Sequence, residues 1–209
     1  MTADHYKTLA EAAEARIKIE RSEFLGIAFP IATDDEFFAA LARIEKKYFD
    51  ATHHCWAFRL FHEARQRSSD AGEPSGSAGK PILNAIETAG FHDVGVVVVR
   101  WYGGIKLGTG GLARAYRDGA AEVLALAQPL DRYVYERITV IVPFDQLSTA
   151  YRLVQPPNVV LVEERFAQRN EFVFDVRTSL AASFLETLTE KRLHIDRASA
   201  GGREDVTPR

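Results

Sequence analysis

Glycine is concentrated in one segment of the chain that can bind an anion. Five of the nine residues from 103 to 111 are glycines, and the alanine-rich periodicity of a helix follows over residues 112–126. Backbone N–H groups at the start of a helix have no intrahelical partners and carry the positive end of the helix dipole. The sequence therefore predicts a phosphate site whose donors are Thr109, Gly110 and Gly111. The alternative is that the glycines only permit a tight turn and close packing.

Basic residues around this segment reverse the sign of the whole chain. The formal net charge is −3, yet residues 65–117 hold seven basic and four acidic residues. Such a local excess of cations favours phosphate contact, and aromatic side chains beside it can stack on bases. The predicted phosphate contacts are Lys80, Arg100, Lys106, Arg114 and Arg117. The predicted stacking residues are Trp56, Trp101 and Tyr102.

Carboxylates and hydroxyls in one loop offer a second kind of chemistry. Asp70 and Glu73 stand among three serines, after a strand that bears His53. A carboxylate or an imidazole can act as a general base toward a hydroxyl. The candidate catalytic residues are therefore Asp70, Glu73 and His53. The alternative is that the carboxylates only neutralise nearby cations through surface ion pairs.

Metal and cofactor motifs are incomplete. His53, His54 and Cys55 are zinc-binding residue types, and a histidine can activate a thiol. Because side chains alternate along a strand, His54 points away from the other two. We therefore expect a packed cysteine beside a hydrogen-bonded histidine, and no metal. Residues 108–113 fit the G-x-G-x-x-A dinucleotide pattern, but about seven residues separate them from the preceding strand, so no cofactor is predicted.

Periodicity places these residues in an α/β domain. The predicted order is strands over 16–23 and 24–31, a helix over 35–49, a strand over 52–61, an exposed loop over 62–79, a helix over 80–89, a strand over 94–101 and a helix over 112–126. In the strand predicted over 94–101, residues 94–99 are apolar and β-branched apart from Gly95, which predicts burial on both faces of the sheet.

A second domain follows a break near residue 130. Pro129 and Asp131 interrupt the chain, and plain alternating elements replace the glycine-rich composition. The predicted order is strand 134–142, helix 144–154, strands 159–166 and 171–177, helix 181–191 and strand 193–198. This βαββαβ order is ferredoxin-like. The expected domains are residues 1–129 and 130–198, followed by a disordered tail over residues 199–209.

Composition also bears on where in the cell the protein is expected. One cysteine excludes an internal disulfide framework, and the start of the chain does not resemble a signal peptide. The longest apolar run is far short of the roughly 20 residues that a membrane helix requires. The sequence therefore predicts a soluble, cytoplasmic protein without membrane contact.

Three motifs resemble the signature of the YigZ/Impact family. They are T-H-H-C-W-A at residues 52–57, S-D-A-G-E-P-S-G-S-A-G-K-P at 69–81 and V-V-R-W-Y-G-G-I-K-L-G-T-G-G-L at 98–112. The resemblance covers residues 17–127, and residues 134–198 resemble the C-terminal domain of bacterial members. It implies an N-terminal α/β two-layer domain like those of a small-subunit ribosomal protein, elongation factor G and the GHMP kinases.

The resemblance also carries functional expectations. Eukaryotic relatives regulate translation through protein contacts of a stress-kinase activator, whereas the bacterial branch is biochemically undefined. Together with the basic glycine segment, this favours a non-enzymatic factor that binds RNA or the ribosome. One alternative is a protein-interaction regulator of translation without RNA contact. In that case the exposed loop from Glu63 to Ser77 would be a partner epitope, and the ferredoxin-like domain a second contact surface or a homodimer surface. The other alternative is a small hydrolase.

Overall fold

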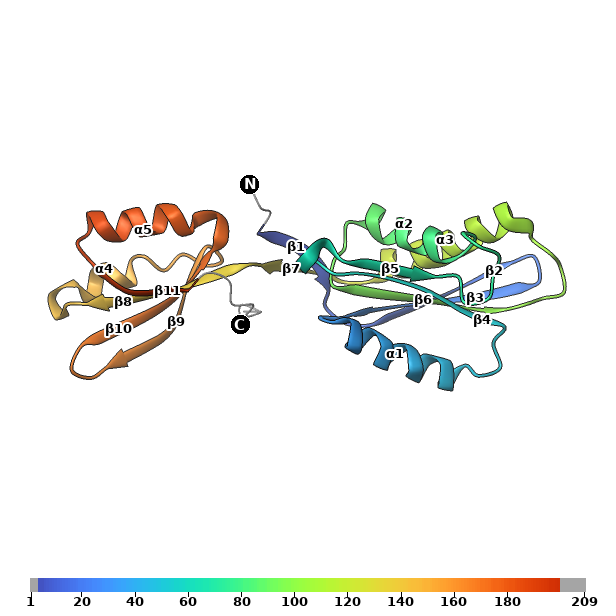
Figure 1. Ribbon diagram of the computed structural model, residues 1–209, viewed down its shortest axis with the longest axis horizontal. Coiled ribbons are helices and arrows are strands. Elements are labelled where there is room, and N and C mark those ends of the chain that lie inside the picture. The colour runs from blue at the N-terminus through green and yellow to red at the C-terminus, as the bar shows by residue number, and fades with distance from the viewer. Residues whose placement is uncertain (1–3, 200–209) are drawn as a thin grey trace. The chain divides into compact units, whose positions relative to one another are not determined.

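The computed structural model describes residues 4–199 and forms two compact units (Figure 1). The N-terminal unit is Lys7–Asp131, and the C-terminal unit combines residues 4–6 with residues 132–199. The break after residue 131 lies two residues beyond the expected one, and residues 4–6 group with the second unit rather than the first. The predicted tail lies outside the described residues from residue 200 onward, and Ser199 ends the last strand.

A five-stranded antiparallel sheet forms the centre of the N-terminal unit. Its strand order is β2-β3-β6-β4-β5. The strands are β2 (Ala13–Ile19), β3 (Ser22–Pro30), β4 (His53–Arg59), β5 (Gln66–Ser69) and β6 (Val94–Trp101). Strand β5 lies inside the segment that the sequence predicted as a loop. It pairs with β4 as an edge strand and is mostly exposed, so its polar residues show no apolar alternation.

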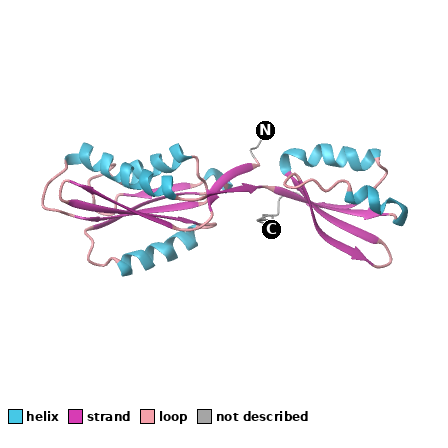
Figure 2. Ribbon diagram, turned by 180° about the vertical axis from the view of Figure 1, so that it is seen from behind, coloured by secondary structure: helices cyan, strands magenta, loops and turns pink. Residues whose placement is uncertain are grey.

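Helices cover both faces of this sheet (Figures 1 and 2). They are α1 (Asp34–Lys47) on one face, and α2 (Gly79–Ala89) and α3 (Gly108–Leu126) on the other. Along β6, Val97 and Val99 join the core under α1, whereas Val96 and Val98 join the core under α2 and α3. The unit therefore has three layers, where the resemblance implied two, because both faces of the central strands are apolar.

Local sequence explains where the helices begin. Thr33 caps α1, since its side chain accepts a hydrogen bond from the Glu36 N–H, and the Glu36 carboxylate accepts one from the Ala32 N–H. Helix α3 begins at Gly108, four residues before the predicted start. The φ of Gly108 is +68°, a left-handed conformation that favours glycine. Gly110 and Gly111 therefore lie inside the first turn rather than before it.

The C-terminal unit has the ferredoxin-like order expected from the sequence. Its sheet is antiparallel, with order β11-β8-β10-β9. The elements are β8 (Tyr135–Val142), α4 (Leu147–Tyr151), β9 (Val159–Phe166), β10 (Asn170–Arg177), α5 (Ala181–Glu190) and β11 (His194–Ser199). One face of the sheet packs on both helices through a core that includes Ile138, Phe172, Phe174, Phe184 and Leu188.

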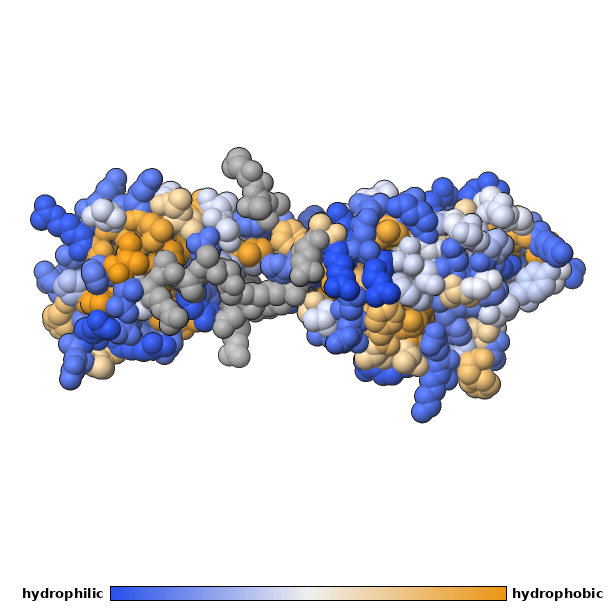
Figure 3. Space-filling view, in the orientation of Figure 1, coloured by the Kyte–Doolittle hydropathy of each residue, from blue (hydrophilic) through white to orange (hydrophobic). Residues whose placement is uncertain are grey.

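Two short strands and three single helical turns complete the description. Strands β1 (His5–Leu9) and β7 (Pro129–Tyr133) pair with each other, and the sequence did not predict them. The 3-10 turns are His62–Ala64, Phe144–Gln146 and Thr178–Leu180. On the face shown in Figure 3, hydrophobic residues form an area in the middle of the C-terminal unit, with hydrophilic residues around it. No helix among residues 4–199 is both long and apolar enough to cross a membrane.

Asp4 makes the C-terminal unit sensitive to acid. Its carboxylate accepts hydrogen bonds from Arg177 Nη2 at 2.7 Å and the Ser179 N–H at 2.9 Å. Burial alone would raise the pKa of Asp4, but these hydrogen bonds and the Arg177 charge outweigh burial and lower the pKa from 3.8 to about 2. The resulting stability is fully present above pH 3.8 and is lost as the pH falls toward 2.

We expect this acid-sensitive contribution to be about 2 kcal/mol in free energy of unfolding. An NMR titration of the Asp4 carboxyl carbon should show the low pKa, and Arg177→Met should move it upward. In Asp4→Asn, the loss of stability between pH 4 and pH 2 should shrink by the same amount. An Asp4 pKa that Arg177→Met leaves unchanged would show that the ion pair has no such role.

Candidate functional site

A buried ion pair links the loop before α2 to the rest of the N-terminal unit. The side chain of Glu73 is 4% exposed, and that of Arg100 on β6 is 6% exposed. Glu73 Oε1 accepts hydrogen bonds from Arg100 Nη1 at 2.6 Å and from the Tyr116 hydroxyl of α3 at 2.7 Å. Arg100 Nη2 donates to Ser22 Oγ of β3 at 3.3 Å. Glu73 therefore joins the loop directly to β6 and α3, and Arg100 extends this network to β3.

Asp70 fixes the start of α2. Its carboxylate accepts hydrogen bonds from the backbone N–H groups of Gly76, Ala78 and Gly79, at 2.8 to 2.9 Å. Burial alone would raise the pKa of Asp70, but these three bonds outweigh it and lower the pKa. A Cβ at Gly79 would lie 2.7 Å from the backbone of Ser69, so only glycine permits this close packing of α2 on β5. Asp70 is thus a charged cap.

The three catalytic candidates lie near one another but have structural partners. His53 Nδ1 hydrogen-bonds the Ala71 carbonyl at 2.9 Å, and its Nε2 lies 4.0 Å from Glu73 Oε2. Ser77 Oγ donates to the Pro74 carbonyl at 2.6 Å. Among the described residues, no serine or threonine hydroxyl bonds the side chain of His53, Asp70 or Glu73. The polar atoms of these candidates that the structure describes are therefore bonded mainly to backbone groups, Arg100 and Tyr116.

Cys55 lies beneath this loop as a buried thiol. It is 0% exposed, and its Sγ donates to the Asp70 carbonyl at 2.9 Å. Burial raises the pKa of Cys55 from 9.0 to about 12, and the Tyr116 hydroxyl offsets this only in part. The described residues contain no group of three or more histidine, cysteine or acidic side chains that could hold a metal ion.

We expect Cys55 to resist thiol reagents at neutral pH. A thiol with a pKa near 12 forms almost no thiolate, which is the reactive species, and burial also denies the reagent access. Because the chain has one cysteine, an Ellman titration reports Cys55 alone. The native protein should react at least about a hundredfold more slowly than the protein in denaturant. Equal rates would contradict the buried position.

Exposed cations lie at the starts of two helices, with Lys80 in the first turn of α2 and Lys106 and Arg114 on either side of the first turn of α3. Lys80, Lys106 and Arg114 are exposed and form no ion pair with any described residue. A Cβ placed on Gly110 would lie 3.9 Å from Arg114 Nη1, so this guanidinium lies close to the first turn. That turn holds no acidic residue, and the N-cap Leu107 provides no capping side chain. The first turn of α3 therefore presents backbone donors and unmatched positive charge.

Two of the expected phosphate contacts lie elsewhere. Arg100 is buried in its bonds to Glu73 and Ser22, so it cannot meet a phosphate at the surface. Arg117 lines a groove between α2 and α3 and donates to Asp118 Oδ1 at 2.8 Å. The sequence groups all five cations by their charge. The structure separates Arg100, which is buried, and Arg117, which is paired with Asp118, from the other three.

The predicted stacking residues also differ in access. Trp56 packs against Phe37, Phe38 and Phe58 on the α1 side of the sheet. Trp101 Nε1 donates to Asp50 Oδ2 at 3.1 Å, which fixes its ring. Tyr102 is 45% exposed in the loop before α3. Only Tyr102 among the three thus presents an exposed ring.

Sequence reasoning missed Tyr116 and Ser22. Tyr116 is fully buried in the apolar stripe of α3, and its hydroxyl donates to Glu73. A tyrosine on the buried face of a predicted helix needs a hydrogen-bond partner, so the helical pattern held a usable indication. Ser22 follows a turn and carries no comparable indication in the sequence.

Comparison with known proteins matches both units. A model of the Impact N-terminal domain matches residues 20–124. The IMPACT family member YvyE of Bacillus subtilis is 32% identical over 186 residues, covering 88% of this chain and 86% of that protein. An IMPACT family member from Thermus thermophilus is 42% identical over 137 residues, covering 66% of this chain and 74% of that protein.

A solved structure agrees with the fold. The crystal structure of a hypothetical protein matches with a TM-score of 0.65 and 24% identity, and covers 97% of this chain and 100% of that one. Fold and motifs together define a two-domain α/β protein with an Impact N-terminal domain. The chain belongs to the IMPACT family, as its sequence motifs indicated.

Proposed function

We propose that this protein is a cytoplasmic, non-enzymatic factor that binds RNA or the ribosome and is linked to translation regulation. Its phosphate contacts are Lys80, Lys106 and Arg114, with the first-turn N–H groups of α3 as additional donors. The observation that carries the proposal is the unmatched positive charge at the start of α3, which has neither an acidic residue nor a capping side chain.

The position of the acidic residues supports phosphate binding. Asp70 and Glu73 precede Lys80 in the same loop, and exposed carboxylates there would repel a phosphate. Instead, Glu73 is bonded to Arg100 and Tyr116, and Asp70 is bonded to three backbone N–H groups. The two carboxylates of the loop are therefore bonded to groups of the protein and do not face a phosphate at the surface.

Family membership supports the link to translation. Resemblance to the IMPACT family implies translation regulation, since that is the role of its eukaryotic relatives. The exposed ring of Tyr102, four residues before Lys106 in the chain, also suits single-stranded RNA, because aromatic side chains stack on its bases. We leave Arg100 out of the proposed surface because it is buried, and Trp56 and Trp101 because their rings pack against or bond to protein groups.

Titration of a fluorescently labelled single-stranded RNA tests the proposal. Anisotropy should show saturable binding at low salt, and affinity should fall linearly on a log–log plot as salt rises, because bound phosphates release counterions. Absence of binding at low salt would remove the proposed function.

A protein-interaction regulator is the second candidate. The observation that favours it is a pair of exposed aromatic side chains on the C-terminal unit, Tyr151 and Phe166, which both contact the buried Phe172. Exposed aromatic groups of this kind are enriched in protein interfaces. A pull-down from cell extract, with and without nuclease, separates the two candidates. Partners that persist after nuclease treatment favour this second function, and partners that vanish favour RNA binding.

A further inference from the structure

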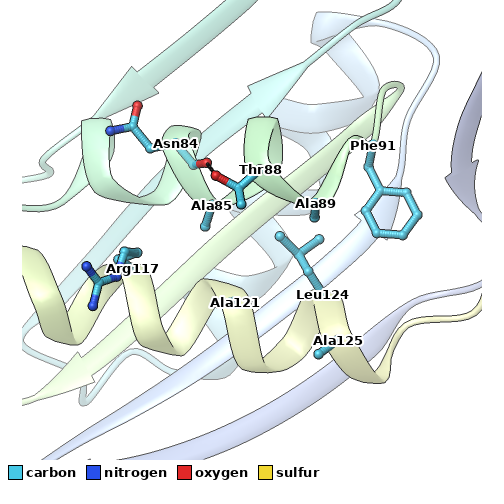
Figure 4. Close-up of a pocket in the computed structure, with 9 residues that line it drawn as sticks. All are labelled: Asn84, Ala85, Thr88, Ala89, Phe91, Arg117, Ala121, Leu124 and Ala125. Carbon is cyan, nitrogen blue, oxygen red and sulfur yellow. Dashed lines mark hydrogen bonds between the residues drawn. The ribbon is translucent and has the colours of Figure 1, made fainter.

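A groove of about 480 Å³ lies between α2 and α3 on the surface of the N-terminal unit (Figure 4). Four of its nine lining residues are alanines, with Ala85 and Ala89 on α2 and Ala121 and Ala125 on α3. Because these side chains are single methyl groups, the two helices leave a space that larger residues would fill. Its volume lies within the range of about 300–1,000 Å³ that is typical of small-molecule sites.

The groove has a polar end and an apolar end. Figure 4 places Asn84 and Arg117 at one end and Phe91 and Leu124 at the other. The guanidinium of Arg117 is bonded to Asp118, but both side chains are about half exposed, at 54% and 49%. A pair this exposed contributes little, so a ligand anion can compete for the guanidinium.

We propose that this groove binds a small amphipathic carboxylate. The aliphatic chain would lie along the alanines toward Phe91 and Leu124, where its burial removes apolar surface from water. The carboxylate would bond Arg117, since a guanidinium suits the planar geometry of a carboxylate. The charge of Arg117 selects an anion over a cation or an alcohol of equal length.

This ligand site is independent of the proposed RNA surface. It uses neither Lys106 nor the first turn of α3, and Arg117 is absent from the proposed phosphate contacts. A variant of one site therefore need not change binding at the other. Failure of RNA binding and failure of carboxylate binding are separate results.

Octanoate is a suitable probe, with octylamine and octanol as controls of equal chain length. Titrations followed by amide chemical shifts should show saturable binding of octanoate, with the shifted amides on the facing sides of α2 and α3. Arg117→Gln should weaken octanoate by about tenfold through loss of the charged hydrogen bond. Ala121→Leu should abolish binding by filling the groove.

Matched variants separate specific binding from general effects. Arg43→Gln and Ala42→Leu change an exposed arginine and an exposed alanine on α1, and both should bind octanoate as the unaltered chain does. Ala89→Leu fills the groove from α2 and should repeat the effect of Ala121→Leu, even if one of the two disturbs folding. The proposal is overturned if octanoate does not saturate, if octylamine or octanol binds as tightly, or if both filling variants retain binding.

Discussion

Replacing Glu73 with alanine is expected to lower the free energy of unfolding of the N-terminal unit by about 3–5 kcal/mol. The reason is the position of its partner. Arg100 is 5% exposed and would keep its charge in the interior without an acidic partner. Tyr116 would also lose the acceptor of its hydroxyl. The free energy of unfolding of Glu73→Gln should lie between those of the unaltered chain and Glu73→Ala, because glutamine keeps the shape of the side chain but removes the charge.

Tryptophan fluorescence during urea unfolding measures this effect on the correct unit. Both tryptophans, Trp56 and Trp101, lie in the N-terminal unit. Glu14→Ala is the matched control, since Glu14 pairs with Lys47 at the surface with side chains 49% and 62% exposed. Its expected cost is under about 1 kcal/mol. A loss for Glu73→Ala no larger than that of Glu14→Ala would show that the buried pair does not hold the loop.

Periodicity was sufficient for most of the fold. Strand β9 has the predicted bounds, residues 159–166, and Pro157 and Asn158 mark its start. The strands that were not predicted lack a clear alternation of apolar and polar residues. Strand β5 is polar, and it is held by backbone pairing to β4, which no periodicity reveals. Strands β1 and β7 pair across more than a hundred residues, and neither is a long alternating run.

The start of α3 was predictable from local sequence, but the contacts of the neighbouring side chains were not. Glycines before an alanine-rich helix indicated the start of α3, because that inference needs only local sequence. The burial of Arg100 was not predicted, since its partner Glu73 lies 27 residues earlier in a polar loop. The one indication that Arg100 is buried was its position near the end of a strand that is buried on both faces. Pairings between distant residues depend on tertiary packing, which residue spacing does not encode.

The proposed RNA surface predicts a large effect when its cations are removed together. In the variant Lys80→Ala, Lys106→Ala and Arg114→Ala, three phosphate contacts are lost. The slope of log affinity against log salt should fall by about 2 for a single strand, and affinity at low salt should fall on the order of a hundredfold. All three side chains are exposed, so the fold should be unaffected.

The control is an equal loss of charge on the opposite face of the sheet. Arg43→Ala, Lys46→Ala and Lys47→Ala remove three exposed cations from α1. Measuring the salt dependence of RNA affinity for both triple variants and the unaltered chain is the most direct test of the account. We predict that only the Lys80, Lys106 and Arg114 variant loses slope and affinity. Equal losses in both variants, or no loss in either, would contradict phosphate binding at the start of α3.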